Sequence, residues 1–317
     1  MTKVIADTRK AFSRALCELA ESDDRILGMS ADMGYIIAEY MRTFPERFIN
    51  VGISEPNLVG MASGLAVSGM IPFVTTMSCF LSLRACEQIR TDVCYANSNV
   101  KIVGTAGGTA YGNQGNTHMA LEDIAVVSSF ANMVVLVPAD GVATQEAVKA
   151  AAEYEGPVYI RIGRGVTPIV YEDDYSFNGE KMEFRIGGSN TLREGSDVTI
   201  IAAGCVMVHN ALEAAKLLES DGISARVIDM YSVKPLDRDA ILKSANETRA
   251  IVTVEDHQLR GGLGSAVCQI VAEENPIRIK CLGVPDTFVP IAEHDELLRR
   301  YSLDAKGIAK AAVSVIS

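Results

Sequence analysis

The stretch Pro56–Leu83, PNLVGMASGLAVSGMIPFVTTMSCFLSL, contains no charged residue and decides which folds are open to the chain. A run of this length raises the question of a membrane-spanning helix. Turn formers and polar residues interrupt the run where such a helix would have to continue, namely Gly69, Pro72, Thr75, Thr76 and Ser78. We therefore expect a helix, a turn, a strand and the start of a second helix, all of them buried against the protein, a partner or a ligand.

The same alternation of helix and strand extends in both directions from this stretch. Apolar spacing predicts helices at 11–20, 55–69, 79–93, 119–130 and 141–154, and strands at 25–29, 71–75, 100–104, 133–137 and 157–162. Such alternation is typical of a mostly parallel, doubly wound α/β sheet.

A second domain follows a polar stretch that is rich in turn formers, between residues 167 and 196. Beyond it we expect strands at 198–202, 225–228, 250–254 and 277–281, with helical patterns at 210–218 and 239–244. A length of 317 residues suits two domains. We predict an α/β protein with two doubly wound, mostly parallel sheet domains at 1–170 and 191–317, joined by a linker at 171–190.

Composition excludes several classes of protein. The net charge of −11 opposes binding of a phosphate backbone, which needs clustered Lys and Arg. Seven cysteines form no CxxC pair, and charged residues interrupt any signal-peptide pattern among the first twenty residues. We expect a cytoplasmic protein with reduced thiols that binds neither nucleic acid nor a membrane.

Three polar clusters follow predicted strands, where open α/β sheets bind ligands. Glu55 opens the charge-free helix and should be poorly solvated, although a carboxylate favoured by the helix dipole would look the same. The glycine-rich loop 105–119 carries His118, which could exchange protons with a substrate or belong to a surface loop. Arg161 and Arg164 could bind an anion or form ion pairs. The other histidines have no such setting and are expected to be structural or solvated: His209, His257 and His294.

The order of the motifs resembles that of the transketolase family. In the first half these are GISEPN (52–57), SCFLSLRACEQIR (78–90), GNTHMALED (115–123), VPAD (137–140) and IRIGR (160–164), as in the pyrimidine-binding domain of transketolases and of 1-deoxyxylulose-5-phosphate synthase. In the second half EGSDVTIIAAGCVMVHNALEAA (194–215), ARVIDMYSVKPLD (225–237) and VEDHQLRGGLGSAV (254–267) resemble the C-terminal domain of the family. The resemblance covers nearly the whole chain.

The resemblance implies that the chain binds thiamine diphosphate. Glu55 matches the glutamate that hydrogen-bonds N1′ of the aminopyrimidine ring and thereby promotes removal of the thiazolium C2 proton. Phe80 matches an aromatic residue packed on that ring, and Ile53 is a further candidate contact. Leu83 stands where the family has another aromatic residue, and Asp32 matches an aspartate near the cofactor, at the boundary between subunits.

The resemblance also implies residues that contact a sugar phosphate. His118 matches a histidine beside the reactive carbon, while Arg164 and Arg9 match arginines at the phosphate end. The family reads GEDGPTH where this chain reads GNQGNTH, so Gln114 replaces an aspartate that contacts a substrate hydroxyl. Ala106 stands in place of a further histidine of the sugar-binding loop. These differences predict preserved activation and an altered substrate specificity.

The diphosphate and Mg²⁺ of the cofactor are bound in the family by a domain marked by a GDG motif, which this sequence lacks. We expect that domain, with the Mg²⁺ ligands, on a separate N-terminal partner subunit, and no metal ligands on this chain. Because the cofactor lies between the two domain types, two copies of each chain form the simplest closed assembly, an α2β2 heterotetramer.

The resemblance predicts the C-terminal subunit of a split transketolase, which passes a two-carbon ketol unit from a ketose phosphate to an aldose. Two alternatives stay open: the beta subunit of a 2-oxoacid dehydrogenase, and a non-catalytic binding or regulatory protein that kept the fold. A nicotinamide-binding protein is disfavoured, since GGLGSA at 261–266 lacks the GxGxxG spacing.

Overall fold

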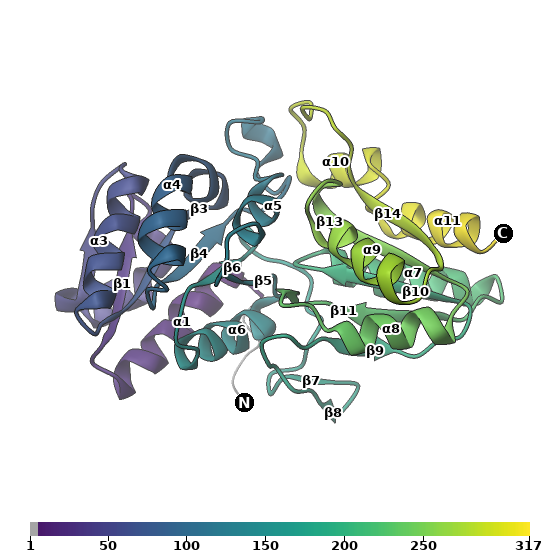
Figure 1. Ribbon diagram of the computed structural model, residues 1–317, viewed down its shortest axis with the longest axis horizontal. Coiled ribbons are helices and arrows are strands. Elements are labelled where there is room, and N and C mark those ends of the chain that lie inside the picture. Colours follow the sequence, from purple (N-terminus) through teal and green to yellow (C-terminus); the bar gives the residue numbers. More distant parts are fainter. Residues whose placement is uncertain (1–5) are drawn as a thin grey trace.

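The computed structural model describes residues 6–317, which form two α/β halves placed side by side, each a sheet covered by helices (Figure 1). The first half contains α1 (Thr8–Ser22), β1 (Ile26–Ser30), α2 (Ala38–Thr43), β2 (Phe48–Asn50), α3 (Glu55–Val67), β3 (Ile71–Met77), α4 (Cys86–Gln88), β4 (Lys101–Thr105), α5 (Asp123–Ser128), β5 (Val134–Leu136), α6 (Gly141–Glu153) and β6 (Val158–Arg161). The connection contains a short hairpin of β7 (Ser176–Phe177) and β8 (Glu180–Lys181). The second half contains β9 (Asn190–Arg193), β10 (Val198–Ala203), α7 (Met207–Ser220), β11 (Ala225–Asp229), β12 (Ser232–Lys234), α8 (Arg238–Glu247), β13 (Ala250–Gln258), α9 (Leu263–Glu274), β14 (Arg278–Val284), α10 (His294–Arg300) and α11 (Ala305–Ile316).

The first sheet has the strand order β12-β5-β6-β4-β3-β1-β2, and all its neighbours pair in parallel except β12 and β5. Helices α1 and α6 cover one face, where Phe12 and Ala147 are fully buried. Helices α3, α4 and α5 cover the other face. Strand β3 is buried along its whole length, as its uncharged sequence requires. The fold class of the first half is therefore confirmed.

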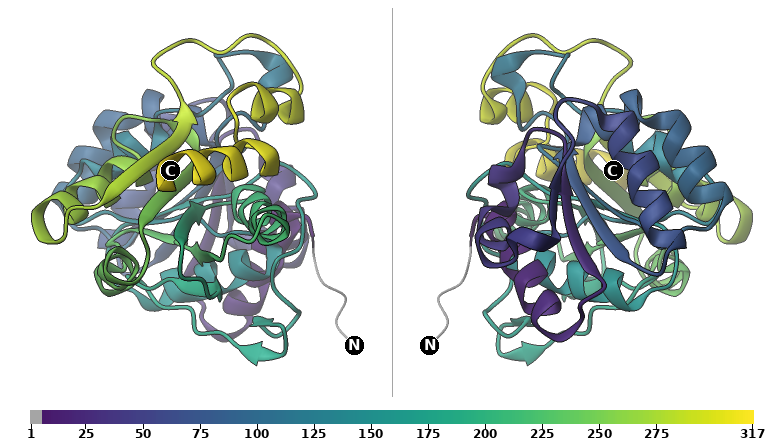
Figure 2. Two further views of the ribbon diagram at one scale, coloured as in Figure 1. Left: turned by 90° about the vertical axis from the view of Figure 1, so that its right-hand side faces the viewer. Right: turned by 90° about the vertical axis from the view of Figure 1, so that its left-hand side faces the viewer.

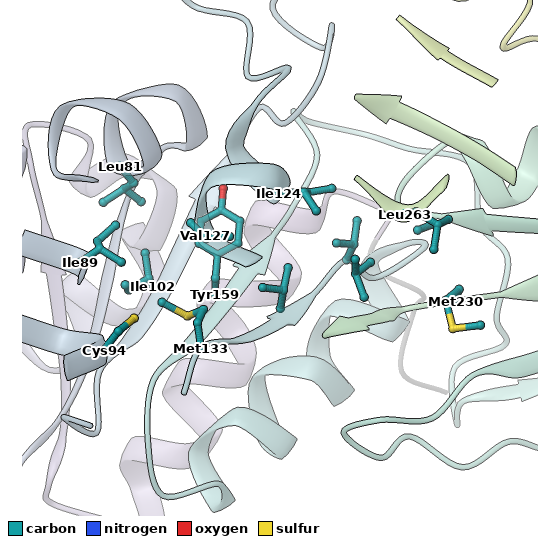
Figure 3. Packing of buried hydrophobic residues seen from close by; sticks show 14 of the residues in the cluster. Leu81, Ile89, Cys94, Ile102, Ile124, Val127, Met133, Tyr159, Met230 and Leu263 are labelled. Atoms are coloured by element: carbon teal, nitrogen blue, oxygen red, sulfur yellow. The ribbon is translucent and has the colours of Figure 1, made fainter. Parts of the chain in front are cut away.

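The second sheet has the order β14-β13-β10-β11-β9, with parallel pairing except at β9. Helices α7 and α11 pack together, and α8 packs with α9. The hydrophobic core continues between the two halves. Figure 3 shows one cluster running from Leu81 and Ile89 of the first half to Met230 and Leu263 of the second.

Strand β12 is a feature that the sequence did not predict. It belongs to the second half but pairs antiparallel with β5 at the edge of the first sheet. The Lys234 ammonium donates to the carbonyl of Ser128 at 2.8 Å and to that of Phe130. The second half therefore closes an edge of the first sheet that would otherwise expose unpaired backbone groups.

One expectation about local structure was wrong. The helix predicted at 119–130 begins at Asp123, because Ala120 exchanges two backbone hydrogen bonds with Gly108 (2.9 and 3.0 Å) and cannot join a helix. The uncharged stretch was expected to be buried against the protein, a partner or a ligand, and this chain alone covers it only in part, since Val67 of α3 is 78% exposed and Leu83 is 49% exposed. None of the helices between residues 6 and 317 is long and apolar enough to cross a membrane.

Candidate functional site

A row of side chains crosses the carboxyl edge of the first sheet. Strands β2, β1, β3, β4 and β6 are parallel neighbours, so the segments that follow them lie next to one another. Glu55 follows β2, Phe80 follows β3, His118 follows β4 and Arg164 follows β6. The strand order thus brings together residues that are more than a hundred positions apart in the sequence.

Glu55 forms an ion pair with Arg84 at one end of this row. The Glu55 side chain is 2% exposed and begins α3, while Arg84 Nη1 lies 3.1 and 3.0 Å from its two carboxylate oxygens. The Arg84 guanidinium also lies 4.5 Å from the centre of the Phe80 ring. A π-helical turn over Phe80–Arg84 aligns these two side chains. Sequence reasoning missed Arg84, although it is the first charge after the uncharged stretch.

The row continues from Phe80 to Arg164 through two further rings. The centres of Phe80 and His118 are 5.5 Å apart in an edge-on arrangement, and His118 stacks on Tyr111 at 5.7 Å. The Arg164 guanidinium lies 3.8 Å from the centre of the Tyr111 ring, a cation–π contact. His118 Nδ1 lies 2.9 Å from the Thr117 hydroxyl. Tyr111 was not singled out from the sequence, where nothing distinguishes it from other loop residues.

Three other candidates lie beside the Glu55 end of the row with their side chains open to solvent. Ile53 is 75% exposed, and Leu83 is half exposed one residue before Arg84. Asp32 follows β1, is exposed, and adopts a positive φ of 59° with its N–H donating to Asn50 Oδ1 at 3.1 Å. Two exposed apolar side chains and one exposed carboxylate thus lie near the buried carboxylate of Glu55.

Arg9 and Arg164 line one cavity of about 390 Å³ between the two halves of the chain. Residues of the second half complete the lining, including Cys205 and His294. Arg9 forms a long ion pair of 3.5 Å with Asp7. Gln114, by contrast, is exposed on the short turn Gly112–Gln114.

Arg161 and His294 belong to a buried polar network beneath the row. Arg161 is an ion-pair residue, with Nε 3.0 Å from Asp123 Oδ2 and Nη2 donating to the Asp256 carbonyl at 2.8 Å. The Thr109 backbone N–H donates to the Asp256 carboxylate at 2.9 Å, and the Thr109 hydroxyl lies 3.0 Å from His294 Nδ1. The sequence had left Arg161 open between anion binding and ion pairing, and it gave no reason to connect His294 with the histidine loop.

The cysteines near the row are not nucleophiles. Burial raises the pKa of Cys79 to about 12 and that of Cys205 to about 12, so both are thiols at neutral pH. Between residues 6 and 317 no group of three or more His, Cys, Asp or Glu side chains could hold a metal ion. The chemistry of the row rests on one carboxylate, one imidazole and arginines.

Comparisons with known proteins agree with this architecture. Residues 5–169 match the family model "Transketolase, pyrimidine binding domain", and residues 187–308 match "Transketolase, C-terminal domain". The chain is 41% identical to one of the subunits of an apulose-4-phosphate transketolase from Phocaeicola vulgatus, over 97% of both chains. It is 39% identical to the 6-deoxy-6-sulfo-D-fructose transketolase subunit SqwH of Clostridium sp., over 97% of this chain and 94% of the relative.

A solved structure of a split-gene transketolase, described as an inactive β4 tetramer, superimposes with a TM-score of 0.88 at 44% identity and covers 98% of both chains. The two domain matches occur in the family order, and the resemblance inferred from the motifs is confirmed. The chain belongs to the transketolase family and corresponds to the C-terminal subunit of transketolases that are split into two chains.

Proposed function

We propose that this subunit, with an N-terminal partner, transfers a two-carbon ketol unit from a ketose phosphate to an aldose. The observation that carries the proposal is the unbroken row of contacts from Glu55 through Arg84, Phe80, His118 and Tyr111 to Arg164. Such a row offers a carboxylate and an apolar ring at one end, an imidazole in the middle and a cation at the other end, which is the order that a cofactor ring, a sugar chain and its phosphate would need.

The Glu55 end fits the aminopyrimidine ring of thiamine diphosphate. A flat ring needs an apolar platform and one hydrogen-bond partner, and the partly buried Phe80 with the exposed Ile53 and Leu83 lies near one buried carboxylate. Thiamine diphosphate supplies the carbon nucleophile and electron sink that cleavage of a ketose requires. In this proposal Glu55 holds a proton at the ring nitrogen N1′. Arg84 breaks its hydrogen bond to at least one Glu55 carboxylate oxygen, which then faces the ring. Asp32 borders the same surface.

The other end of the row fits the substrate. His118 is half-buried between two aromatic rings, in a position to donate to or accept from the hydroxyls of a sugar. Arg164, with Arg9 in the adjoining cavity, would bind the terminal phosphate. Gln114 replaces an acidic side chain in the loop and would hydrogen-bond a substrate hydroxyl without adding charge.

The partner subunit would bind the diphosphate through Mg²⁺, in an α2β2 heterotetramer. The exposed apolar side chains of Ile53, Met61, Val67 and Leu83 around α3 support a partner at this face, since they are uncovered in the single chain. We propose the domain division 1–170, 171–190 and 191–317, which the matches over 5–169 and 187–308 support. A cytoplasmic location stays a prediction.

The test is co-expression with a GDG-bearing partner chain and an assay of ketol transfer from xylulose 5-phosphate. Transfer should require both chains, thiamine diphosphate and Mg²⁺. Failure with every ketose donor would overturn the proposal. Decarboxylation of a 2-oxoacid would instead favour the dehydrogenase alternative, which the matches to transketolase subunits do not support.

A further inference from the structure

The loop that carries His118 touches the C-terminal domain along most of its length. It follows β4 and meets the loop at residues 285–293 between β14 and α10. Both loops project beyond the rest of the molecule at the top of the views in Figure 2. The C-terminal domain therefore reaches the candidate substrate site at this point, although it contributes no residue to the row itself.

A pair of hydrogen bonds joins Asn116 to the main chain of Val289. Asn116 Nδ2 donates to the Val289 carbonyl at 2.7 Å, and the Val289 N–H donates to Asn116 Oδ1 at 2.9 Å. The side-chain amide thus satisfies both backbone groups of one residue, as a neighbouring strand would. Asn116 lies two residues before His118.

An apolar cluster lies directly beneath these hydrogen bonds. Val289 is 2% exposed and packs with Met119 and Leu121 from the histidine loop and with Val284 and Leu297 from the C-terminal domain. Met119 is the residue after His118. The histidine is therefore flanked on both sides by residues attached to the C-terminal domain.

Two more contacts fix the start of the same loop. Gly112 approaches the C-terminal domain so closely that an added Cβ would lie 2.5 Å from the Ala292 carbonyl oxygen. Thr109 joins Asp256 and His294 through the buried hydrogen bonds of the polar network. Attachments at Thr109, Gly112, Asn116 and Met119 leave the loop little freedom to move independently of the C-terminal domain.

We propose that Asn116 is a positioning residue, which uses Val289 of the C-terminal domain to hold His118 between Phe80 and Tyr111. The proposal rests on the proposed role of His118 at the substrate. The family motif GEDGPTH has a proline where this chain has Asn116 in GNQGNTH, and proline has no amide side chain with which to form these bonds. The pair of hydrogen bonds between Asn116 and Val289 would then substitute for the rigidity that proline gives.

The sharpest variant is Asn116→Asp, because it keeps the size of the side chain and replaces the donating NH₂ group with an oxygen that only accepts when ionised. Its carboxylate still accepts from the Val289 N–H, but its second oxygen faces the Val289 carbonyl unless it is protonated. In the assembled enzyme kcat/KM for the ketose donor should fall by about tenfold to a hundredfold at pH 8. The ratio of variant to native kcat/KM should recover in part as the pH falls toward 5, since the facing Val289 carbonyl oxygen disfavours the ionised form of the new carboxyl and the protonated acid donates again. Asn116→Ala should show the loss without the recovery.

A second readout does not depend on activity. In the free chain the backbone amides of residues 106–122 should exchange hydrogen faster in Asn116→Asp and Asn116→Ala than in the native protein. Asp286→Asn, at an exposed side chain of the same C-terminal loop, is the matched control and should change neither readout.

Unchanged exchange in both Asn116 variants, or native kcat/KM in both, would overturn the proposal. The proposal would also be overturned if the loss of kcat/KM came with a comparable loss of affinity for thiamine diphosphate and a lower melting temperature. That result would mean general destabilisation. If the complex assembled from the native chain showed no ketol transfer, that result would count against the proposed function. Hydrogen exchange in the free chain would still decide whether Asn116 holds the loop.

Discussion

The guanidinium of Arg84 lies 3.0 Å from the buried carboxylate of Glu55 and 4.5 Å from the centre of the Phe80 ring. The single chain therefore holds Glu55 in a hydrogen-bonded ion pair at the place proposed for the pyrimidine. A buried carboxylate without a partner would be costly, and the ion pair avoids that cost in the absence of a ligand. A cofactor that hydrogen-bonds Glu55 has to compete with Arg84.

Replacing Glu55 tests the proposed activating role. Glu55→Gln keeps the shape of the side chain and removes its charge, so kcat of the assembled enzyme should fall by about 10²- to 10⁴-fold. Glu55→Ala should have at least this effect. Size-exclusion chromatography should show intact assembly for both, and Glu46→Gln, at an exposed site, should keep native activity. A native rate in Glu55→Ala would mean that another residue activates the cofactor.

The Arg84–Glu55 ion pair should be measurable in the free chain by a double-mutant cycle. Arg84→Met should lower the free energy of unfolding more in the native background than in Glu55→Gln, with a coupling of about 1 kcal/mol because Arg84 is half exposed. Urea unfolding at one fixed protein concentration measures the four free energies. Additive effects of the two substitutions would show that the pair contributes nothing to stability.

Arg164 and Tyr111 should control the affinity for phosphorylated sugars. Arg164→Ala removes a charge-assisted contact and should raise KM for a ketose phosphate by at least about tenfold. Tyr111→Leu removes the cation–π contact with Arg164, worth about 0.5–1 kcal/mol, and should raise this KM by about two- to fivefold. Unphosphorylated ketoses provide the control for Arg164→Ala, since their KM should not change in that variant. Equal effects on both kinds of donor would argue against a phosphate role for Arg164.

Asp229, at the end of β11, should make stability depend on pH. Burial raises the pKa of Asp229 to about 8 from an ordinary value of 3.8, although the Tyr171 hydroxyl donates to it at 2.6 Å. The folded state therefore keeps a proton that the unfolded state loses, and the resulting stability declines as the pH rises from about 4 to about 8. Asp229→Asn should lack this decline and should unfold with a free energy at least about 1 kcal/mol above the native value at pH 8.

Thermal or urea unfolding between pH 4 and pH 9 measures this difference. The exposed carboxylate of Asp173 offers a control, because Asp173→Asn should follow the native pH dependence. Parallel curves for the native protein and Asp229→Asn would contradict the elevated pKa.

Much of the fold was predictable because hydrophobic periodicity reports local structure directly. The uncharged stretch gave α3 and β3 nearly to the residue, since Gly69 and Pro72 limit where a helix ends. The start of α5 was not predictable, because it depends on the pairing of Ala120 with Gly108. The same holds for β12, whose partner β5 lies about a hundred residues earlier in the chain.

The sequence by itself determined the family, the two α/β domains and the identity of the candidate side chains, because motifs and periodicity are properties of short segments. Only the tertiary structure decided what those side chains touch. The order of parallel strands aligned Glu55, Phe80, His118 and Arg164, and packing between the two halves brought Asn116 to Val289. Residues far apart in the chain meet only when the burial of apolar surface fixes the strand order, and no local pattern records those contacts.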